Sequence, residues 1–123
     1  MKLKVIAFLV VVGALALTAC GGPATPEDIQ GDAAAGQQKF LTTCVSCHGP
    51  DAKGMPGLGK NLTTSQFIKD RTNTEMVEFL KGGRPSSDPL NTTGVDMPPR
   101  GGNPVLTDTD LLDIITYVRG LQP

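Results

Sequence analysis

The stretch CVSCH occupies residues 44–48. Two cysteines three positions apart, followed at once by a histidine, suit three kinds of chemistry: a redox dithiol, half of a zinc site, or a covalent attachment point for haem. The rest of the sequence has to separate these three interpretations.

Composition indicates that something bulky and apolar is needed to complete the core. The 123 residues include 15 Gly and 10 Pro but only four Phe, one Tyr and no Trp. Small domains with so little apolar mass usually recruit disulfides, a metal or another large group. From Cys20 onward, nine basic residues stand against twelve acidic ones, so we expect no nucleic-acid partner.

The first residues have the pattern of an export signal. Lys2 and Lys4 precede an uncharged, almost wholly apolar run at 5–17. This run has the length of a secretory signal and falls short of the roughly 20 residues that a membrane-spanning helix needs. A signal anchor that stays attached is the alternative.

The end of that run predicts a lipid anchor. Residues 17–20, LTAC, resemble the bacterial lipobox. The resemblance implies that 1–19 is a lipoprotein signal peptide and that Cys20 carries a lipid on the outer, periplasmic or extracytoplasmic, face of a membrane. Residues 20–30, rich in Gly, Pro and Thr, would be a flexible tether to a domain at 31–123. A free Cys20 is the alternative.

The remaining residues predict a mostly helical domain. Helices are expected at 33–41, 64–70, 73–81 and 107–120. Asp32 and Asn73 are the expected N-caps of the first and third, and Thr107 with Asp110 forms a capping pattern for the last. Two Gly- and Pro-rich loops, 49–62 and 82–106, separate them, and no run alternates as a strand does. A structureless stretch as long as the second loop is either disordered or wrapped around something.

This organisation favours the haem interpretation of CVSCH. A dithiol would need a thioredoxin-like sheet, for which there are no strands. Structural zinc needs four ligands, whereas His48 is the only histidine and Cys20 is assigned to the lipobox. Haem attachment accounts for every cysteine, with Cys44 and Cys47 bound to the porphyrin vinyl groups and His48 directed at the iron. The porphyrin would also supply the missing apolar mass.

With these residues the chain resembles the class I c-type cytochromes over most of 31–121. Besides CVSCH, it carries Gly36, Phe40 and Tyr117, which match the pattern in which the first helix crosses the last. The plain alternative is that these three are unrelated core and surface residues. The resemblance implies an all-α fold of three to four helices around one covalent haem c, with a long Gly/Pro-rich distal loop. It also implies an electron carrier between respiratory or photosynthetic redox partners, not an enzyme.

The second axial ligand of the iron is expected to be Met97. The resemblance places a methionine beside proline between the middle and last helices, and Met97 precedes Pro98 in that segment. Met55 lies close after His48, and Met76 has the spacing of ordinary helix packing. Lys60, Met55 or water on the iron is the alternative, with Met97 a core residue.

Other residues have assignments that stay open at this stage. The carbonyl that orients His48 belongs to either Lys60 or Pro56. Arg84 and Arg100 are candidates to pair with the haem propionates, although exposed arginines are the commoner outcome. Lys53 and Lys60 are candidates to border the exposed haem edge.

Two further functions are weighed beside a tethered electron carrier. One is a haem enzyme or gas sensor with an open iron, although the lone histidine leaves none for acid–base work. The other is a fixed subunit, because 91–104 and 106–122 resemble the monohaem subunits of alternative complex III. The expected partners are redox proteins such as a quinol-oxidising complex or a terminal oxidase.

Overall fold

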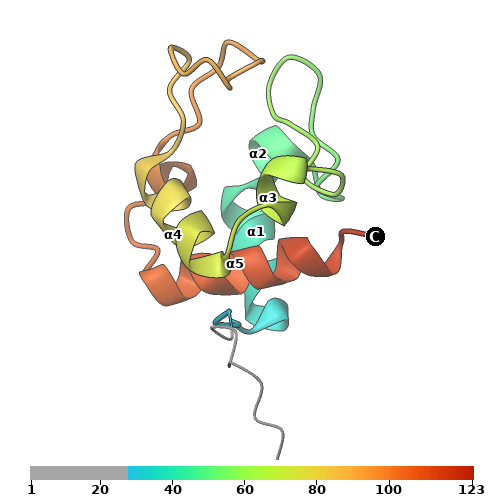
Figure 1. Cartoon of the computed structure of the whole chain (residues 1–123), viewed down its shortest axis with the longest axis vertical. Helices are drawn as coiled ribbons and strands as arrows, with labels where there is room; N and C mark the ends of the chain where they lie inside the picture. The colour runs from blue at the N-terminus through green and yellow to red at the C-terminus, as the bar shows by residue number, and fades with distance from the viewer. Residues whose placement is uncertain (1–27) are drawn as a thin grey trace, which may run out of the picture.

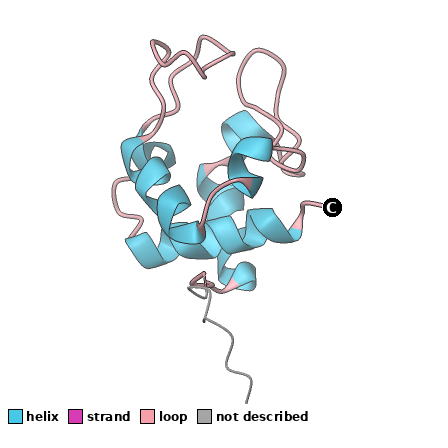
Figure 2. Ribbon diagram, viewed as in Figure 1, coloured by secondary structure: helices cyan, strands magenta, loops and turns pink. Residues whose placement is uncertain are grey.

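The computed structural model describes residues 28–123, in which five α-helices and one 3-10 helix form the domain. The elements are α1 (Ala33–Thr43), α2 (Val45–His48), α3 (Gln66–Lys69), α4 (Asn73–Gly82), η1 (Pro99–Gly102) and α5 (Asp108–Gly120). The predicted signal peptide, Cys20 and most of the predicted tether lie outside the described residues. Within residues 28–123 there is no strand, only two isolated bridges, so the predicted all-α class is confirmed (Figure 2). No helix in this part of the chain is long and apolar enough to cross a membrane.

Two of the three expected caps are present, and the third is wrong. Asp32 accepts hydrogen bonds from the first-turn amides of α1, and Thr107 forms a capping box with Asp110 at the start of α5. Helix α4 is capped by Thr72, not by Asn73. Asn73 is fully buried, and its side chain donates to the Ile29 carbonyl. The amide is therefore used for tertiary contacts and is not free to cap the helix.

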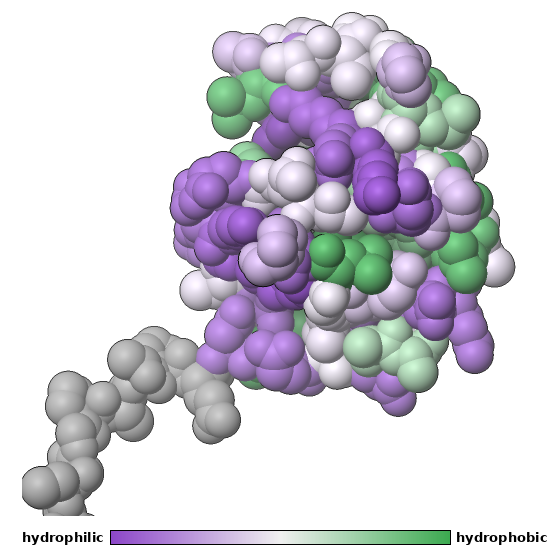
Figure 3. All heavy atoms as spheres, turned by 90° about the vertical axis from the view of Figure 1, so that its right-hand side faces the viewer, coloured by the Kyte–Doolittle hydropathy of each residue, from purple (hydrophilic) through white to green (hydrophobic). Residues whose placement is uncertain are grey.

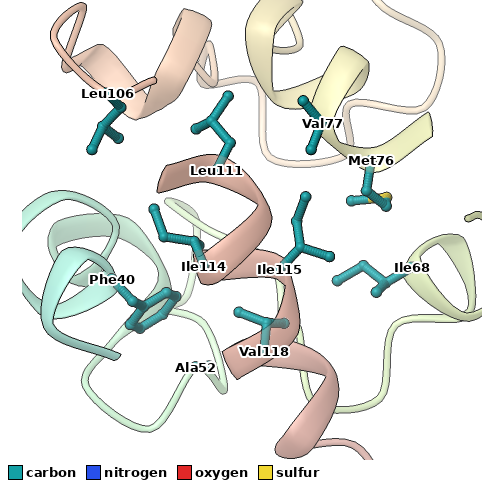
Figure 4. Close-up of a cluster of buried hydrophobic side chains, with 10 residues drawn as sticks. All are labelled: Phe40, Ala52, Ile68, Met76, Val77, Leu106, Leu111, Ile114, Ile115 and Val118. Carbon is teal, nitrogen blue, oxygen red and sulfur yellow. The ribbon is translucent and has the colours of Figure 1, made fainter. Parts of the chain in front are cut away.

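Helix α5 lies at the centre of the hydrophobic core. Its buried stripe contacts Phe40 of α1 on one side and Met76 of α4 on the other, with Ile68 of α3 nearby (Figure 4). The stripe consists of Leu111, Ile114, Ile115 and Val118, as the spacing predicts. Figure 1 shows α5 across the base of the domain, while the two long loops rise on the opposite side.

The expected crossing of the first and last helices is confirmed. A Cβ on Gly36 would lie 1.9 Å from the carbonyl oxygen of Asp113, so only glycine allows α1 to approach α5 this closely. One turn further on, the rings of Phe40 and Tyr117 pack with their centroids 5.5 Å apart. This crossing fixes the direction in which α1 delivers the chain to Cys44.

Candidate cofactor site

A cavity of about 510 Å³ opens between the helices and the two long loops. Its volume lies in the range of roughly 300–1,000 Å³ that is typical of cofactor pockets. Apolar side chains from all three long helices line it, including Phe40, Met76, Leu80, Ile114 and Val118. The cavity wall also contains the four residues expected to hold haem, namely Cys44, Cys47, His48 and Met97.

The short helix α2 presents the two thiols and the imidazole to the cavity. Cys44 closes α1 and begins α2, and the amides of Cys47 and His48 both donate to its carbonyl oxygen. One tight turn thus brings both cysteines to the same wall. Burial, and then the neighbouring Cys47, raises the pKa of the Cys44 thiol to about 11. A redox dithiol needs a thiol with a lowered pKa, so this environment disfavours that interpretation.

The orientation of His48 is set by a backbone carbonyl. Its Nδ1 lies 2.9 Å from the carbonyl oxygen of Lys60, so Lys60, and not Pro56, supplies the acceptor that the sequence left open. Because a carbonyl oxygen can only accept, Nδ1 carries the proton and Nε2 keeps a free lone pair. Gly59 makes this possible, since a Cβ there would lie 2.1 Å from the carbonyl oxygen of Cys47.

The three candidate methionines differ in position. Met97 is half-buried and lines the cavity, whereas Met55 is 43% exposed and does not. Met76 is a core residue of α4, as its spacing predicts, and its side chain also reaches the cavity wall. Lys60 uses its amino group to donate to the Leu90 carbonyl oxygen.

Met97 is held by its backbone. Its N–H and carbonyl form a pair of hydrogen bonds with Arg84, at 2.8 and 2.7 Å, and this bridge closes the base of the loop 85–96. Gly83 packs against the same carbonyl from the end of α4, where a Cβ would lie 2.3 Å from the Met97 oxygen. The positive φ of 69° at Gly83 also favours glycine. Backbone contacts therefore fix the position of Met97 within the long second loop.

Asn91 organises the interior of the loop 85–96, a role that was not predicted from the sequence. Its side-chain oxygen accepts from the amides of Thr93 and Gly94, and its amide donates to the carbonyls of Pro85 and Val95. An Asn-Thr-x-Gly sequence in a turn-rich segment is a signal for such side-chain-stabilised turns, and it was available from residues 91–94.

The two arginines flanking this segment have different surroundings. Arg100 turns away from the cavity and pairs with Asp108 at 2.9 Å. Arg84 lines the cavity and is buried, with its guanidinium over the rings of Phe67 and Phe79. Among the described residues, its buried Nε has no hydrogen-bond partner, although Asp88 lies 3.4 Å away. Such a donor at a cavity wall suits an anionic group in the cavity.

One side face of the molecule is mixed in character, and the two lysines expected at the edge of the site differ in position. Figure 3 shows one face of the molecule, on which hydrophobic patches are separated by hydrophilic residues. Lys60 lines the cavity, whereas Lys53 does not and lies 3.8 Å from Asp51. Of the two lysines expected at the edge of the site, the structure brings only Lys60 to the cavity wall.

These residues fit a covalently attached haem. The cavity is large and mostly apolar, two thiols and a correctly tautomerised imidazole lie in one wall, and a thioether comes from a separate loop. The Arg84 Nε, which lies 3.4 Å from Asp88 but has no hydrogen-bond partner among the described residues, matches the carboxylates that a haem carries.

Comparison with known proteins gives one consistent family. Residues 33–122 match the family model described as Cytochrome c. Cytochrome c-555 of Chlorobaculum thiosulfatiphilum is 32% identical over 89 residues, which cover 72% of this chain and 95% of that protein. The cbb3-type cytochrome c oxidase subunit CcoP of Rhodobacter capsulatus is 34% identical over 90 residues, but this chain covers only 29% of that subunit. Among solved structures, cytochrome CL of Methylophaga aminisulfidivorans MPT matches with a TM-score of 0.54 and 28% identity, over 72% of this chain and 52% of that one.

Proposed function

The chain belongs to the class I monohaem cytochromes c, and on that premise we propose that a lipid on Cys20 holds it at a membrane surface, where it passes single electrons between redox proteins. Electron transfer with one covalent haem c is the shared property of this family, and the chain is an electron carrier, not an enzyme. When bound, haem c supplies an iron that alternates between the ferrous and ferric states.

In this proposal, Cys44 and Cys47 attach the cofactor. Each would hold the porphyrin through a thioether to one former vinyl group, a linkage equivalent to addition of the thiol S–H across the double bond, which would need no oxidant or leaving group. The high pKa of Cys44 keeps its thiol protonated at neutral pH before attachment. The position of both cysteines on one turn of helix at the cavity wall supports this role.

His48 and Met97 are the residues that we propose would hold the haem iron. The proton of His48 stays on Nδ1 because it is hydrogen-bonded to the Lys60 carbonyl oxygen, and Nε2 would therefore be the coordinating atom. Met97 is held toward the cavity by its backbone bridge to Arg84. Histidine and methionine together raise the reduction potential of a haem iron and suit reversible electron transfer.

Arg84 is proposed to bind a haem propionate. Its Nε is a buried donor without a hydrogen-bond partner among the described residues, at a wall of the same cavity. A charge-assisted hydrogen bond to a carboxylate would satisfy that donor.

The membrane tether and the partners extend the proposal beyond the described residues. We assign 1–19 to a signal peptide, 20–30 to a tether and 31–123 to the haem domain on the outer face of the membrane. The lipobox-like residues 17–20 support the tether. A terminal oxidase or a quinol-oxidising complex is the proposed partner, and the likeness to CcoP, a subunit of a cbb3-type oxidase, favours the oxidase.

The ligation is tested by the absorption spectrum of the ferric, haem-loaded protein. A weak band at the red end reports a methionine–iron bond. We expect this band in the wild type and in Met55→Ala, and its loss in Met97→Ala. If Met97→Ala keeps the band, the distal assignment is wrong.

The tether is tested by cell fractionation and native separation. The wild type should sediment with the membranes, and Cys20→Ser should not. After mild detergent extraction of native membranes, co-migration with a larger redox complex would support a fixed subunit of that complex. Migration at the size of a monomer would contradict a fixed assembly with these partners.

A further inference from the structure

We propose that Lys60 is a positioning residue that couples the two axial ligands, because its carbonyl orients His48 while its side chain holds the loop that leads to Met97. This inference rests on the proposed ligation by His48 and Met97. The structure supports each half of it by a separate contact.

The backbone of Lys60 is fixed to the proximal side of the cavity. Its carbonyl oxygen lies 2.9 Å from Nδ1 of His48. The preceding Gly59 packs against Cys47 with no room for a Cβ, and Gly59 is also bridged to Met55 across a tight turn. Gly54 donates to the carbonyl of His48 at the start of the same loop. These contacts place the Lys60 peptide directly beside CVSCH, so any displacement of this peptide changes the hydrogen bond to His48.

The side chain of Lys60 extends to the other loop. Its Nζ donates to the Leu90 carbonyl oxygen at 2.7 Å, a contact that spans 30 residues of sequence. Leu90 lies within the loop 85–96, whose base is closed by the bridge between Arg84 and Met97. Figure 1 shows the two long loops approaching each other on the side of the domain away from α5.

This contact is the direct link between the two loops. Among the described residues, no other hydrogen bond or ion pair joins residues 49–62 to residues 85–96. Within residues 28–123, Lys60 forms no ion pair with a carboxylate, so the Leu90 carbonyl oxygen is the group that its ammonium contacts. Loss of the ammonium group should loosen the distal loop and, through the backbone of Lys60, the acceptor of His48.

The substitution that isolates this role is Lys60→Met. It keeps the aliphatic stem and the backbone carbonyl but removes the donor, while Lys60→Arg keeps a cationic donor. Lys53→Met is the matched control, because Lys53 lies in the same loop, is exposed and does not line the cavity. All variants are studied as the full-length, haem-loaded protein.

The distal readout is the binding of imidazole to the ferric protein, which requires Met97 to leave the iron. Its apparent affinity follows the population in which the loop has opened. Loss of one net hydrogen bond predicts a rise in that affinity of about fivefold for Lys60→Met. Lys60→Arg and Lys53→Met should bind imidazole like the wild type.

The proximal readout is hydrogen exchange at Nδ1–H of His48, followed by NMR of the ferrous protein. This proton should exchange several-fold faster in Lys60→Met than in the wild type. In Lys60→Arg and Lys53→Met it should exchange at the wild-type rate. The coupling is supported only if imidazole affinity and the exchange rate of the His48 proton both change in Lys60→Met and both have wild-type values in Lys60→Arg. A change in one readout alone, or in neither, overturns it.

Failure of this inference is distinguishable from failure of the proposed function. If His48 and Met97 were not the ligands, the wild type itself would lack the methionine–iron band. If only the coupling is wrong, the wild-type spectrum stays as expected while Lys60→Met behaves like Lys60→Arg.

Discussion

Replacing Gly36 by alanine tests the helix crossing on which the site is built. A Cβ at this position would lie 1.9 Å from the carbonyl oxygen of Asp113 and 2.4 Å from its carbonyl carbon. Ordinary contact begins near 3.4 Å, so α1 and α5 would have to separate by about 1.5 Å. Because the opposing atoms are backbone, no side chain can rotate away.

The magnitude follows from two opposing terms. Overpacking of a well-packed interface costs up to about 3 kcal/mol. Alanine is favoured over glycine within a helix by about 1 kcal/mol, which offsets part of that cost. We expect Gly36→Ala to lower the free energy of unfolding by ~2 kcal/mol, a large share of the roughly 5–15 kcal/mol typical of a small domain.

Guanidinium unfolding of the haem-loaded protein, followed by far-ultraviolet circular dichroism, measures this difference. The control is Gly120→Ala at the end of α5, where an added Cβ meets no neighbouring element within 4 Å and stability should change by less than about 1 kcal/mol. A Gly36→Ala protein as stable as the wild type, at an unchanged denaturant slope, would refute the close approach of α1 and α5.

Two further predictions concern a charged cap and the distal loop. The hydrogen bond from Lys39, followed by those from Thr107, holds the pKa of the Asp110 carboxyl well below its usual value. The ionised Asp110 carboxylate therefore stabilises the folded protein above about pH 4, and this stabilisation is lost as the pH falls further. Asp110→Asn should be less stable than the wild type at pH 7, with the gap narrowing towards pH 3 in denaturation series; a constant gap would contradict this. Asn91→Ala removes the acceptor of the Thr93 and Gly94 amides, so hydrogen exchange at these two amides should accelerate about tenfold while exchange in α5 is unchanged. Exchange at the two amides that is as slow in the variant as in the wild type would count against the role of Asn91.

The parts of the fold that local patterns specify could be predicted. The stripe of α5, its Thr107–Asp110 capping box and the alignment of Gly36 with Phe40 depend on helical spacing, which the sequence displays directly. Three of the four expected site residues, Cys44, Cys47 and His48, were equally accessible, because they lie within one five-residue motif at α2.

Tertiary contacts decided what the patterns left open. Thr72 and Asn73 are both good capping residues, and the burial of Asn73 against Ile29 selects Thr72. Similarly, the acceptor for His48 depends on how tightly Gly59 packs against Cys47, which sequence spacing does not reveal.

The second long loop, 82–106, could also be predicted only in part from the sequence. Its many Gly and Pro residues predicted irregular backbone, and that is correct. Its order comes from the bridge between Arg84 and Met97 and from the side chain of Asn91. The spacing of these residues along the sequence follows neither a helical nor a strand repeat, so no pattern predicted their contacts. The choice of Met97 came from its neighbour Pro98, whereas its placement in the cavity wall required the structure.

The most direct test is the mass of the full-length chain produced in a bacterium that attaches haem to exported proteins. One haem should remain bound to the polypeptide after denaturation in acidic organic solvent, and substituting both Cys44 and Cys47 by alanine should abolish the added mass and the compact fold together. A chain of unmodified mass that still folds compactly and accepts and donates electrons would contradict the account.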